Sequence, residues 1–414
     1  MNTLLNIFKD FRKVKKHIFY LIGACFFVSL IEAAFFILLN FYLKDLNYSD
    51  TAIAQITAYR YVAVMLLAFP FGLYIKGRKL VPFFKIGTIA VPSASLLVLY
   101  AFQYQIDWLI PVGMTLFGVA IVCMNVTALP FIILNSPKEQ HSEAIAMYFQ
   151  VFSSTTFIAG LGNYVLNSIA PELFDEPTVL KIVALLGFVS IYFVSKIKIE
   201  ENISEKIPLK TVLHAYDWKR IATVATPTLI IAIGAGLTVP FLNLFFANVH
   251  QVNSKDFSLL GSFSFVLVTI MITFVPTIRR KYGYKVAITL FQVLAVFALV
   301  VMATTEWYAH LPFALTIAIA AFLLRQPLMN VAGPATSELS LYYVGERNQE
   351  MIGAINASIW SGSWFISSLL FGLMRSWEVS YVNIFLITAV MYGIAICWYV
   401  FLIWNYGKQP TQTE

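Results

Sequence analysis

Long apolar runs separated by short polar segments dominate the pattern of this chain. A helix needs about 20 apolar residues to cross a bilayer, and most of the runs reach that length. The first run extends from residue 18 to residue 43, which is too long for the core of a signal peptide. We therefore predict an all-α membrane protein with twelve transmembrane helices, at residues 18–43, 52–75, 81–103, 108–134, 143–169, 178–195, 221–247, 257–278, 286–306, 311–338, 351–375 and 381–404.

The second half of the chain repeats the first about 205 residues later. The sequence Met124-Asn125-Val126 recurs as Met329-Asn330-Val331, and a proline follows each copy at nearly the same distance. Duplicated bundles of this kind are typical of secondary transporters, whose substrate site lies between the halves. The repeat predicts two pseudo-symmetric six-helix bundles, with a tail at 1–17, bundles at 18–195 and 221–404, a central loop at 196–220 and a second tail at 405–414.

Composition and charge agree with a membrane location. Hydrophobic residues make up 59% of the chain and charged residues 12%, about half the charged share of a soluble domain. Placing the N-terminus in the cytoplasm puts 21 of the 28 Lys and Arg residues in inner loops and tails, against three at outer ends. This asymmetry predicts a multi-pass protein of a bacterial-type inner membrane with both termini cytoplasmic.

Several function classes are disfavoured. No Gly-x-x-x-x-Gly-Lys run is present, the five histidines are scattered without metal-ligand spacing, and the three cysteines fall inside predicted spans. We therefore expect no enzyme activity, no cofactor and no metal. The basic residues follow topology rather than a nucleic-acid surface, so the expected partners are a small-molecule substrate, protons and the lipid bilayer, with the protein a monomer.

The loops after predicted spans two and eight carry a degraded motif. The first loop contains Gly72, then Gly77-Arg78-Lys79, and the second places Arg280-Lys281 before Gly283. Together with six plus six spans and a central loop, these loops resemble the major facilitator superfamily, whose signature there is G-x-x-x-D-R-x-G-R-R. The resemblance covers essentially the whole chain and implies that spans one, four, seven and ten line the cavity. The acid of the signature is missing, and acids in neighbouring inner loops are candidates to replace it. The predicted gating residues are Gly72, Arg78, Lys79, Glu139, Glu143, Arg280, Gly283, Glu346 and Glu350.

Glu32 lies near the middle of the first span. A carboxylate at that depth must face a cavity, find a partner or hold a proton, because its charge costs several kcal/mol in lipid. Glu32 is our candidate for proton coupling, for contact with a cationic substrate, or for a protonated hydrogen bond between helices. Three other basic residues, Arg60, Lys85 and Lys181, are expected near span ends, where they extend their charges toward water.

Arg325 lies at the centre of the tenth span and keeps its charge at any physiological pH. It can hold an anionic substrate group or pair with Glu32 as a static link between the halves. Neither residue has a charged counterpart in the other half, because Glu32 aligns with Ala235 and Arg325 with Ala120. Charges that break the duplication are difficult to assign to the scaffold alone.

Polar and aromatic residues complete the predicted substrate site. Asn40, Asn125, Asn243 and Asn330 occur once on each of spans one, four, seven and ten. They can hydrogen-bond to the substrate, or bond between helices and to backbone freed by prolines. Phe36 shares a helical face with Glu32 and Asn40. The full predicted set is Glu32, Phe36, Asn40, Asn125, Asn243, Arg325 and Asn330.

The sequence therefore predicts a proton-coupled secondary transporter of a small organic solute that works by alternating access. The position of Glu32 on the first span favours proton-driven efflux by antiport. The alternative is uptake, by symport, of an anionic metabolite or siderophore-like compound through Arg325. The motif that marks antiporters on span five is not matched by Gly160-Leu161-Gly162-Asn163, so the direction stays open. A third possibility, of another class, is a non-transporting receptor or a lipid-moving protein with this fold.

Overall fold

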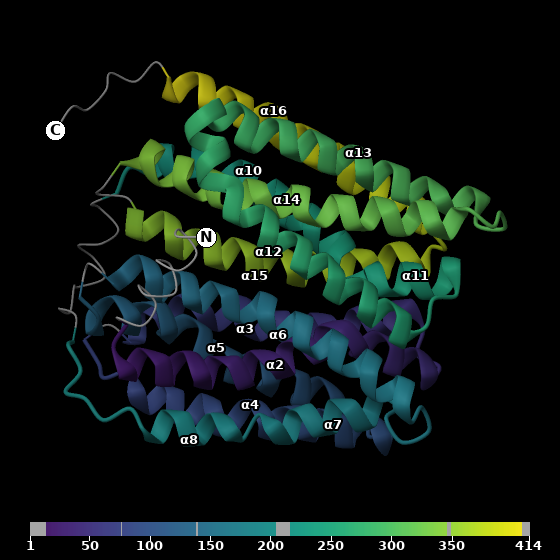
Figure 1. Ribbon diagram of the computed structural model, residues 1–414, viewed down its shortest axis with the longest axis horizontal. Coiled ribbons are helices and arrows are strands. Elements are labelled where there is room, and N and C mark those ends of the chain that lie inside the picture. The colour runs from purple at the N-terminus through teal and green to yellow at the C-terminus, as the bar shows by residue number, and fades with distance from the viewer. Residues whose placement is uncertain (1–13, 76, 138–139, 204–215, 346–348, 408–414) are drawn as a thin grey trace, which may run out of the picture. The chain divides into compact units, whose positions relative to one another are not determined.

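The computed structural model describes residues 14–75, 77–137, 140–203, 216–345 and 349–407, and within these ranges the secondary structure is helical, with no strand. The chain divides into two compact units. The first contains residues 1–48 and 56–208, and the second contains residues 49–55 and 209–414. The first unit is coloured purple to teal and the second mainly green to yellow in Figure 1.

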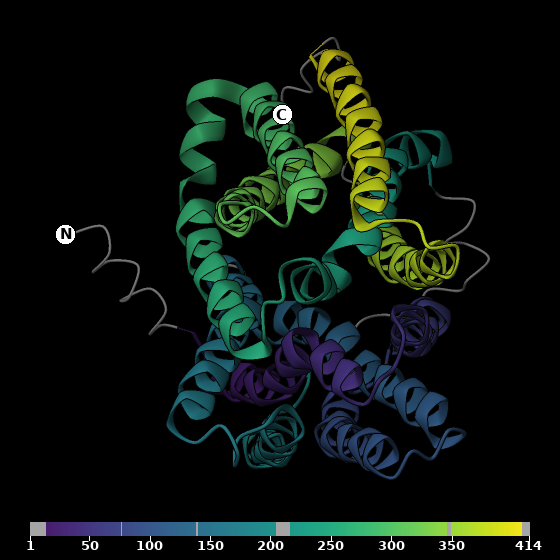
Figure 2. The ribbon, with the colours of Figure 1, turned by 90° about the vertical axis from the view of Figure 1, so that its right-hand side faces the viewer.

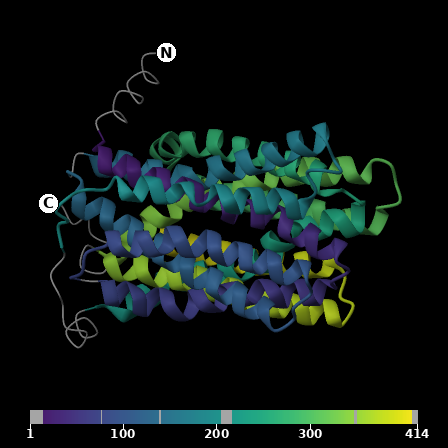
Figure 3. The same cartoon turned by 90° about the horizontal axis from the view of Figure 1, so that it is seen from below.

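Seven helices form the first unit. They are α2 (Lys16–Asp45), α3 (Asp50–Ile75), α4 (Val81–Gln103), α5 (Leu109–Asn135), α6 (His141–Ile169), α7 (Glu176–Leu186) and α8 (Val189–Ser195). The predicted span at 178–195 is thus two consecutive helices rather than one. The first turns of one of these helices, α3, are assigned to the second unit. Seen from below, the long helices of the unit run roughly horizontally (Figure 3).

The second unit follows the same plan with more interruptions. Its elements are α10 (Trp218–Thr238), the 3-10 turn η2 (Val239–Phe241), α11 (Leu242–His250), α12 (Ser254–Tyr284), the π-helical segment η3 (Lys285–Leu290), α13 (Phe291–Thr304), the 3-10 turn η4 (Thr305–Tyr308), α14 (Ala314–Val344), α15 (Gln349–Ser376) and α16 (Tyr381–Tyr406). Since α10 begins at Trp218, the second bundle starts inside the predicted central loop.

The two units use the same packing scheme. In the first, α2 packs against α6, α7 and α8, and α4 packs against α5. In the second, α10 packs against α15 and α16, and α13 packs against α14. Figure 2 looks along many of the helices of each unit, so that their coils are seen end-on. Each unit is therefore a bundle in which the first helix contacts the last two, as the sequence repeat predicts.

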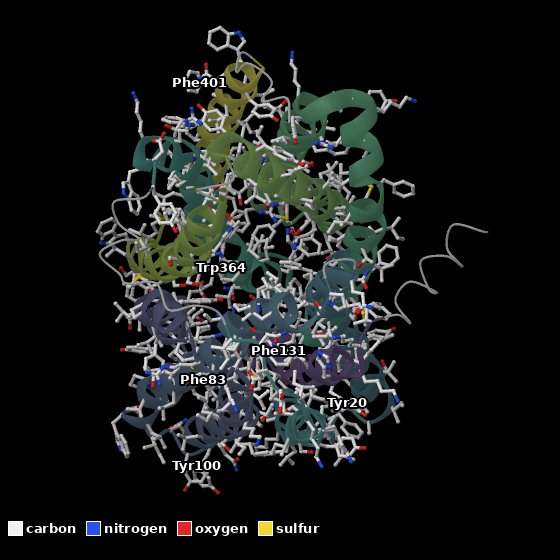
Figure 4. The ribbon with its side chains drawn as sticks, turned by 90° about the vertical axis from the view of Figure 1, so that its left-hand side faces the viewer. Tyr20, Phe83, Tyr100, Phe131, Trp364 and Phe401 are labelled. Carbon is white, nitrogen blue, oxygen red and sulfur yellow. The ribbon has the colours of Figure 1, made fainter. Side chains whose placement is uncertain are left out.

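Ten helical segments in the described residues are long and apolar enough to cross a membrane, with α7 and α8 together forming one of them and α10 to α11 another. The protein is accordingly a multi-pass membrane protein. Aromatic side chains occupy both the interior and the lipid-facing surface. Phe131 is fully buried, whereas Tyr100 and Phe401 are about half exposed and point away from the bundles (Figure 4).

The segment that leaves α8 is held against the first unit. The Glu201 carboxylate accepts hydrogen bonds from the backbone N–H groups of Leu80 and Val81, at the start of α4. The backbone N–H of Asn202 donates to the Asn135 side chain at 3.0 Å, at the end of α5. Glu201 supplies the capping carboxylate that α4 lacks in its own sequence, because Leu80 has no side chain able to accept these bonds.

The first turns of α3 belong to the second unit, although the rest of the helix belongs to the first. Asp50 is buried and accepts hydrogen bonds from the side chains of Arg375, Asn248 and Tyr381. The Thr51 hydroxyl donates to the backbone carbonyl of Gly372 at 3.1 Å. The start of α3 is thus held by hydrogen bonds within the second unit.

Candidate functional site

The Glu32 side chain lies at the middle of α2 and is 12% exposed. Its Oε2 accepts a hydrogen bond from Nη2 of Arg60, on α3, at 3.3 Å, which makes the two residues an ion pair. Its Oε1 lies 3.4 Å from Nδ2 of Asn125, on α5, which donates to it. Three helices of the first unit therefore place one acid, one base and one amide together.

The sequence-based interpretation of Arg60 is wrong. Instead of extending toward water, its guanidinium turns inward to Glu32 and lies over the Phe117 ring, 5.1 Å from the ring centre. Asp50 begins α3 ten residues earlier, which places Arg60 about 15 Å along the helix axis. An internal carboxylate within reach is a better partner than distant water, since a charge at this depth is costly without one.

A close helix approach fixes the position of Arg60. Gly118, on α5, lies directly against the backbone carbonyl of Arg60, so that a methyl group added to the glycine would collide with that oxygen. Small residues at such contacts let neighbouring helices approach each other closely. Gly118 therefore sets the distance between α3 and α5, the helices that present Arg60 and Asn125 to Glu32.

Arg325 lies in α14 of the second unit and is 1% exposed. Its Nη1 donates to Oε1 of the neighbouring Gln326 at 2.9 Å. Its buried Nε has no hydrogen-bond partner among the described residues, and no ion pair of Arg325 is found there. The guanidinium is close enough to the buried Tyr392 hydroxyl of α16 to interact with it electrostatically. Within the first unit, the ion-pair partner of Glu32 is Arg60.

The four asparagines are used in different ways. Asn125 contacts Glu32, as described above, whereas Nδ2 of Asn330 donates to the backbone carbonyl of Gln326 within α14 at 2.8 Å. The Asn243 side chain accepts a hydrogen bond from the Leu244 backbone at the start of α11, 2.9 Å away. Asn40 is buried in α2. Asn330 and Asn243 therefore stabilise their own helices in this structure, next to Pro327 and Pro240.

Phe36 lies one helical turn beyond Glu32 on α2 and is partly buried. It shares the Glu32 face of the helix, as its spacing in the sequence predicts.

The basic loops contain related turns. Gly77 and Gly283 have positive φ angles of 71° and 73°, a conformation that glycine adopts without strain. The Arg78 guanidinium folds back over the Tyr74 ring, 4.1 Å from its centre. Gly72 ends an apolar segment of α3, and Lys79 is exposed.

Of the predicted loop residues, Glu139 and Glu346 lie outside the described residues, as do the side chains of Glu143, Glu350 and Arg280. In the second unit a different acid supplies a charge near the loop: Oε1 of Glu338 lies 2.7 Å from Nη2 of Arg279. Glu338 and Glu201 were not predicted, because Glu338 lies at the end of the tenth predicted span and Glu201 lies in the central loop, far along the chain from the motif. Arg60 and Tyr392 were missed because sequence spacing gives no information on partners in other helices.

Several solved structures have a fold similar to that of this chain. The POT family transporter PepTSo matches with a TM-score of 0.76 at 12% identity, over 95% of this chain and 99% of the other. The D-xylose-proton symporter matches with a TM-score of 0.73 at 12% identity, over 94% and 98%. A bacterial homologue of the iron transporter ferroportin in its inward-facing state gives 0.70 at 14% identity, over 95% and 99%.

At the level of sequence, comparison with protein-family models finds no match, and comparison with curated proteins finds none either. The structural likeness extends over nearly the whole chain in each case. The chain therefore has the fold of the major facilitator superfamily.

Proposed function

We propose that this protein is a proton-coupled secondary active transporter of a small organic solute. It works by alternating access as a monomer in a bacterial-type inner membrane, with both termini in the cytoplasm. The observation that carries the proposal is the Glu32–Arg60 ion pair, because it places a titratable carboxylate beside a permanent cation at the middle of a membrane helix. Among solved structures with this fold is a D-xylose-proton symporter, which supports coupling to protons.

A proton on Glu32 changes the energy of this pair. The ionised carboxylate neutralises Arg60, whereas the protonated acid leaves the guanidinium without its counter-charge in a low-dielectric environment. An arrangement of α2 and α3 that suits the charged pair is then no longer the most stable one. Proton binding and release can thus shift the population of conformations, which is the requirement for coupling.

The same pair bears on the direction of transport. A cationic solute that bound to Glu32 would have to displace Arg60, which already occupies the carboxylate. Glu32 is therefore better suited to carry a proton than to recognise a cation. This geometry favours symport, with uptake of the solute, over the efflux predicted from the position of Glu32 in the sequence. Proton-driven efflux of a cation is the second candidate.

The remaining predicted residues have supporting roles in this proposal. Phe36, Asn40, Asn125, Asn243, Arg325 and Asn330 provide the solute site, with the amides available to it in conformations other than the one described. Opening on the cytoplasmic side involves the loop residues Gly72, Arg78, Lys79, Glu139, Glu143, Arg280, Gly283, Glu346 and Glu350. Arg279 and Glu338 join this set on the basis of their ion pair.

The test uses inside-out vesicles with an acid interior and a pH-sensitive dye. Organic anions and lipophilic cations are added in turn to wild type, Glu32→Gln and Glu32→Asp. Glu378→Gln is the matched control, since it removes an exposed carboxylate outside the bundle. We expect a solute of one class to change the internal pH in wild type and control, Glu32→Gln to abolish the response, and Glu32→Asp to keep part of it.

The pH change also separates the candidates. In such vesicles the lumen corresponds to the periplasmic side, so an importer moves solute and protons from the lumen to the medium. A symported anion preloaded inside leaves together with protons, and the same anion added outside carries protons inward. An antiported cation releases protons from the acid interior when it is added outside. Counterflow of solute that is insensitive to pH in both wild type and Glu32→Gln would contradict proton coupling. Solute binding without any flux would instead indicate a receptor.

A further inference from the structure

Among the described residues of its own unit, Arg325 has no acid near it along the helix axes. The described acids of the second unit are Asp50, Asp217, Asp256, Glu306, Glu338 and Glu378, and each has a position at the end of a bundle. Asp50 pairs with Arg375, Glu338 pairs with Arg279, and Asp217 pairs with Arg220. The Glu306 carboxylate accepts hydrogen bonds from the first backbone N–H groups of α16.

Helix geometry shows how far these acids are from Arg325. Glu338 is on the same helix, 13 residues further on, which corresponds to about 20 Å along its axis. Asp256 lies in the first turn of α12, and Glu378 is in the exposed turn before α16. In the first unit the mid-helix acid Glu32 is taken by Arg60. Glu32 thus has a counter-charge within its own unit, whereas Arg325 has none among the described residues of its own unit.

Burial of an arginine without a counter-charge is unfavourable by several kcal/mol. Arg325 cannot avoid this cost by losing its proton, as a lysine can. A buried cation with no structural partner is retained in a membrane helix when it has a functional partner. The partner that removes the cost is an anionic group that comes from outside the chain.

We infer that the transported solute carries a carboxylate or phosphate group, and that Arg325 and Tyr392 bind it. This inference rests on the proposed function and names its substrate class. Gln326 occupies Nη1 of the guanidinium, whereas Nε has no partner among the described residues. The Nε edge of a guanidinium presents two parallel N–H groups, which match two oxygens of a carboxylate or phosphate.

Tyr392 adds a further donor. Its hydroxyl is buried and interacts with the Arg325 guanidinium, although the two do not reach full hydrogen-bond geometry and no other described side chain bonds to the hydroxyl. Its ring packs against Gly234 of α10, where a methyl group on the glycine would lie 2.9 Å from the ring edge. Three helices of the second unit, α10, α14 and α16, thus hold this pair of donors in position. The oxyanion accepts from both residues while the organic part of the solute extends away from them.

The first experiment measures thermal stability of the purified full-length protein without solute. We expect Arg325→Gln to raise the unfolding temperature, because it removes an uncompensated buried charge. Arg220→Gln is the matched control, since Arg220 is half exposed and paired with Asp217, and it should leave the unfolding temperature nearly unchanged. A marked fall with Arg325→Gln would mean that the arginine has an internal partner, and would overturn the inference.

The second experiment measures binding with four probes: benzoate, succinate, glycerol 3-phosphate and the tetraphenylphosphonium cation. We expect at least one anion to stabilise the wild type and Arg220→Gln. Arg325→Gln should lower the affinity for that anion about 30-fold or more, whereas Arg325→Lys should keep part of the affinity. Tyr392→Phe should cause a smaller loss of affinity than Arg325→Gln. Comparison of the two carboxylates with the phosphate ester shows whether the site prefers a carboxylate or a phosphate group.

The outcomes for the inference and for the proposed function are distinguishable. If anions bind in a way that depends on Arg325 but cause no proton movement, the inferred substrate class is supported and proton coupling is contradicted. If only tetraphenylphosphonium causes proton movement, proton coupling is supported and the inferred substrate class is overturned. Binding of the anions with equal affinity to wild type and Arg325→Gln, or no binding of any of the three, also overturns it.

Discussion

The Asp50 carboxylate accepts a hydrogen bond from Nε of Arg375 at 3.1 Å, which joins the first turn of α3 to the last turn of α15. The Arg375 guanidinium also lies over the Tyr381 ring, 4.4 Å from its centre, and Asn248 donates to both carboxylate oxygens. Asp50 is thus the common acceptor for three side chains of α11, α15 and α16.

We expect Asp50→Ala to destabilise the second unit by about 1–3 kcal/mol, because Arg375 and Tyr381 then lose an acceptor in a largely buried place. Asp50→Asn should lose less stability, since its amide oxygen can still accept a hydrogen bond. Thermal unfolding in detergent measures both. Glu172→Ala, at an exposed loop acid, is the control. Equal unfolding temperatures for Asp50→Ala and the control would show that the cluster contributes nothing to stability.

The contact between α3 and α15 is close enough for an engineered disulfide to join the two helices. A Cβ atom at Gly372 would lie 3.3 Å from Cβ of Ala54, close to the separation of about 3.5–4.5 Å in disulfides. We expect Ala54→Cys with Gly372→Cys to cross-link on mild oxidation, as detected by mass spectrometry after proteolysis. Each single variant serves as a control for reaction with the three native cysteines. A double variant that stays reduced would argue against this helix contact.

Gly118 offers a sharper comparison within the first unit. Gly118→Ala should lower the unfolding temperature, and it should reduce proton-coupled transport, because the methyl group displaces the Arg60 backbone from α5. Gly162→Ala, on α6, is the matched change, since a methyl group there meets no other atom within 4 Å. It should stabilise its helix by up to about 1 kcal/mol. Similar effects of the two alanines would contradict the role given to Gly118.

Glu201 provides a test of the segment after α8. Glu201→Ala should lower the free energy of unfolding by about 0.5–2 kcal/mol, the usual effect of losing a capping side chain. The backbone N–H groups of Leu80 and Val81 then lose their acceptor. Glu200→Ala removes the adjacent, exposed acid and should have little effect. Hydrogen exchange at the start of α4 reports the change locally. Unchanged exchange there in Glu201→Ala would rule out the cap.

The sequence was sufficient for the fold because periodic apolar length and an internal repeat are properties of the chain itself. It also singled out Glu32 and Arg325, since a charge in a long apolar run is visible without a structure. It could not identify their surroundings. Arg60 is 28 residues from Glu32, and its inward turn depends on how closely α3 approaches α5 at Gly118. That distance is a property of packing, which no spacing in the sequence encodes.

The repeat was informative in some places and silent in others. Gly77 and Gly283 lie at matching places in the two halves, and both have a positive φ angle. The repeat gave no indication that Glu201 or Glu338 supplies the acids near these loops, since the two residues have unrelated positions in the two halves. The ion pairs of the two halves therefore do not follow the duplication.

The attachment of Glu201 and Asn202 to the ends of α4 and α5 has a consequence for the gene as well as for the protein. The folded limit of the first unit lies beyond its last membrane helix, so a coding sequence cut directly after Ser195 would deprive that unit of part of its own structure. Halves expressed from two separate reading frames should therefore reassemble best when the break follows Ile203. A fusion or recombination point in the same place would exchange one bundle for another with its ends complete.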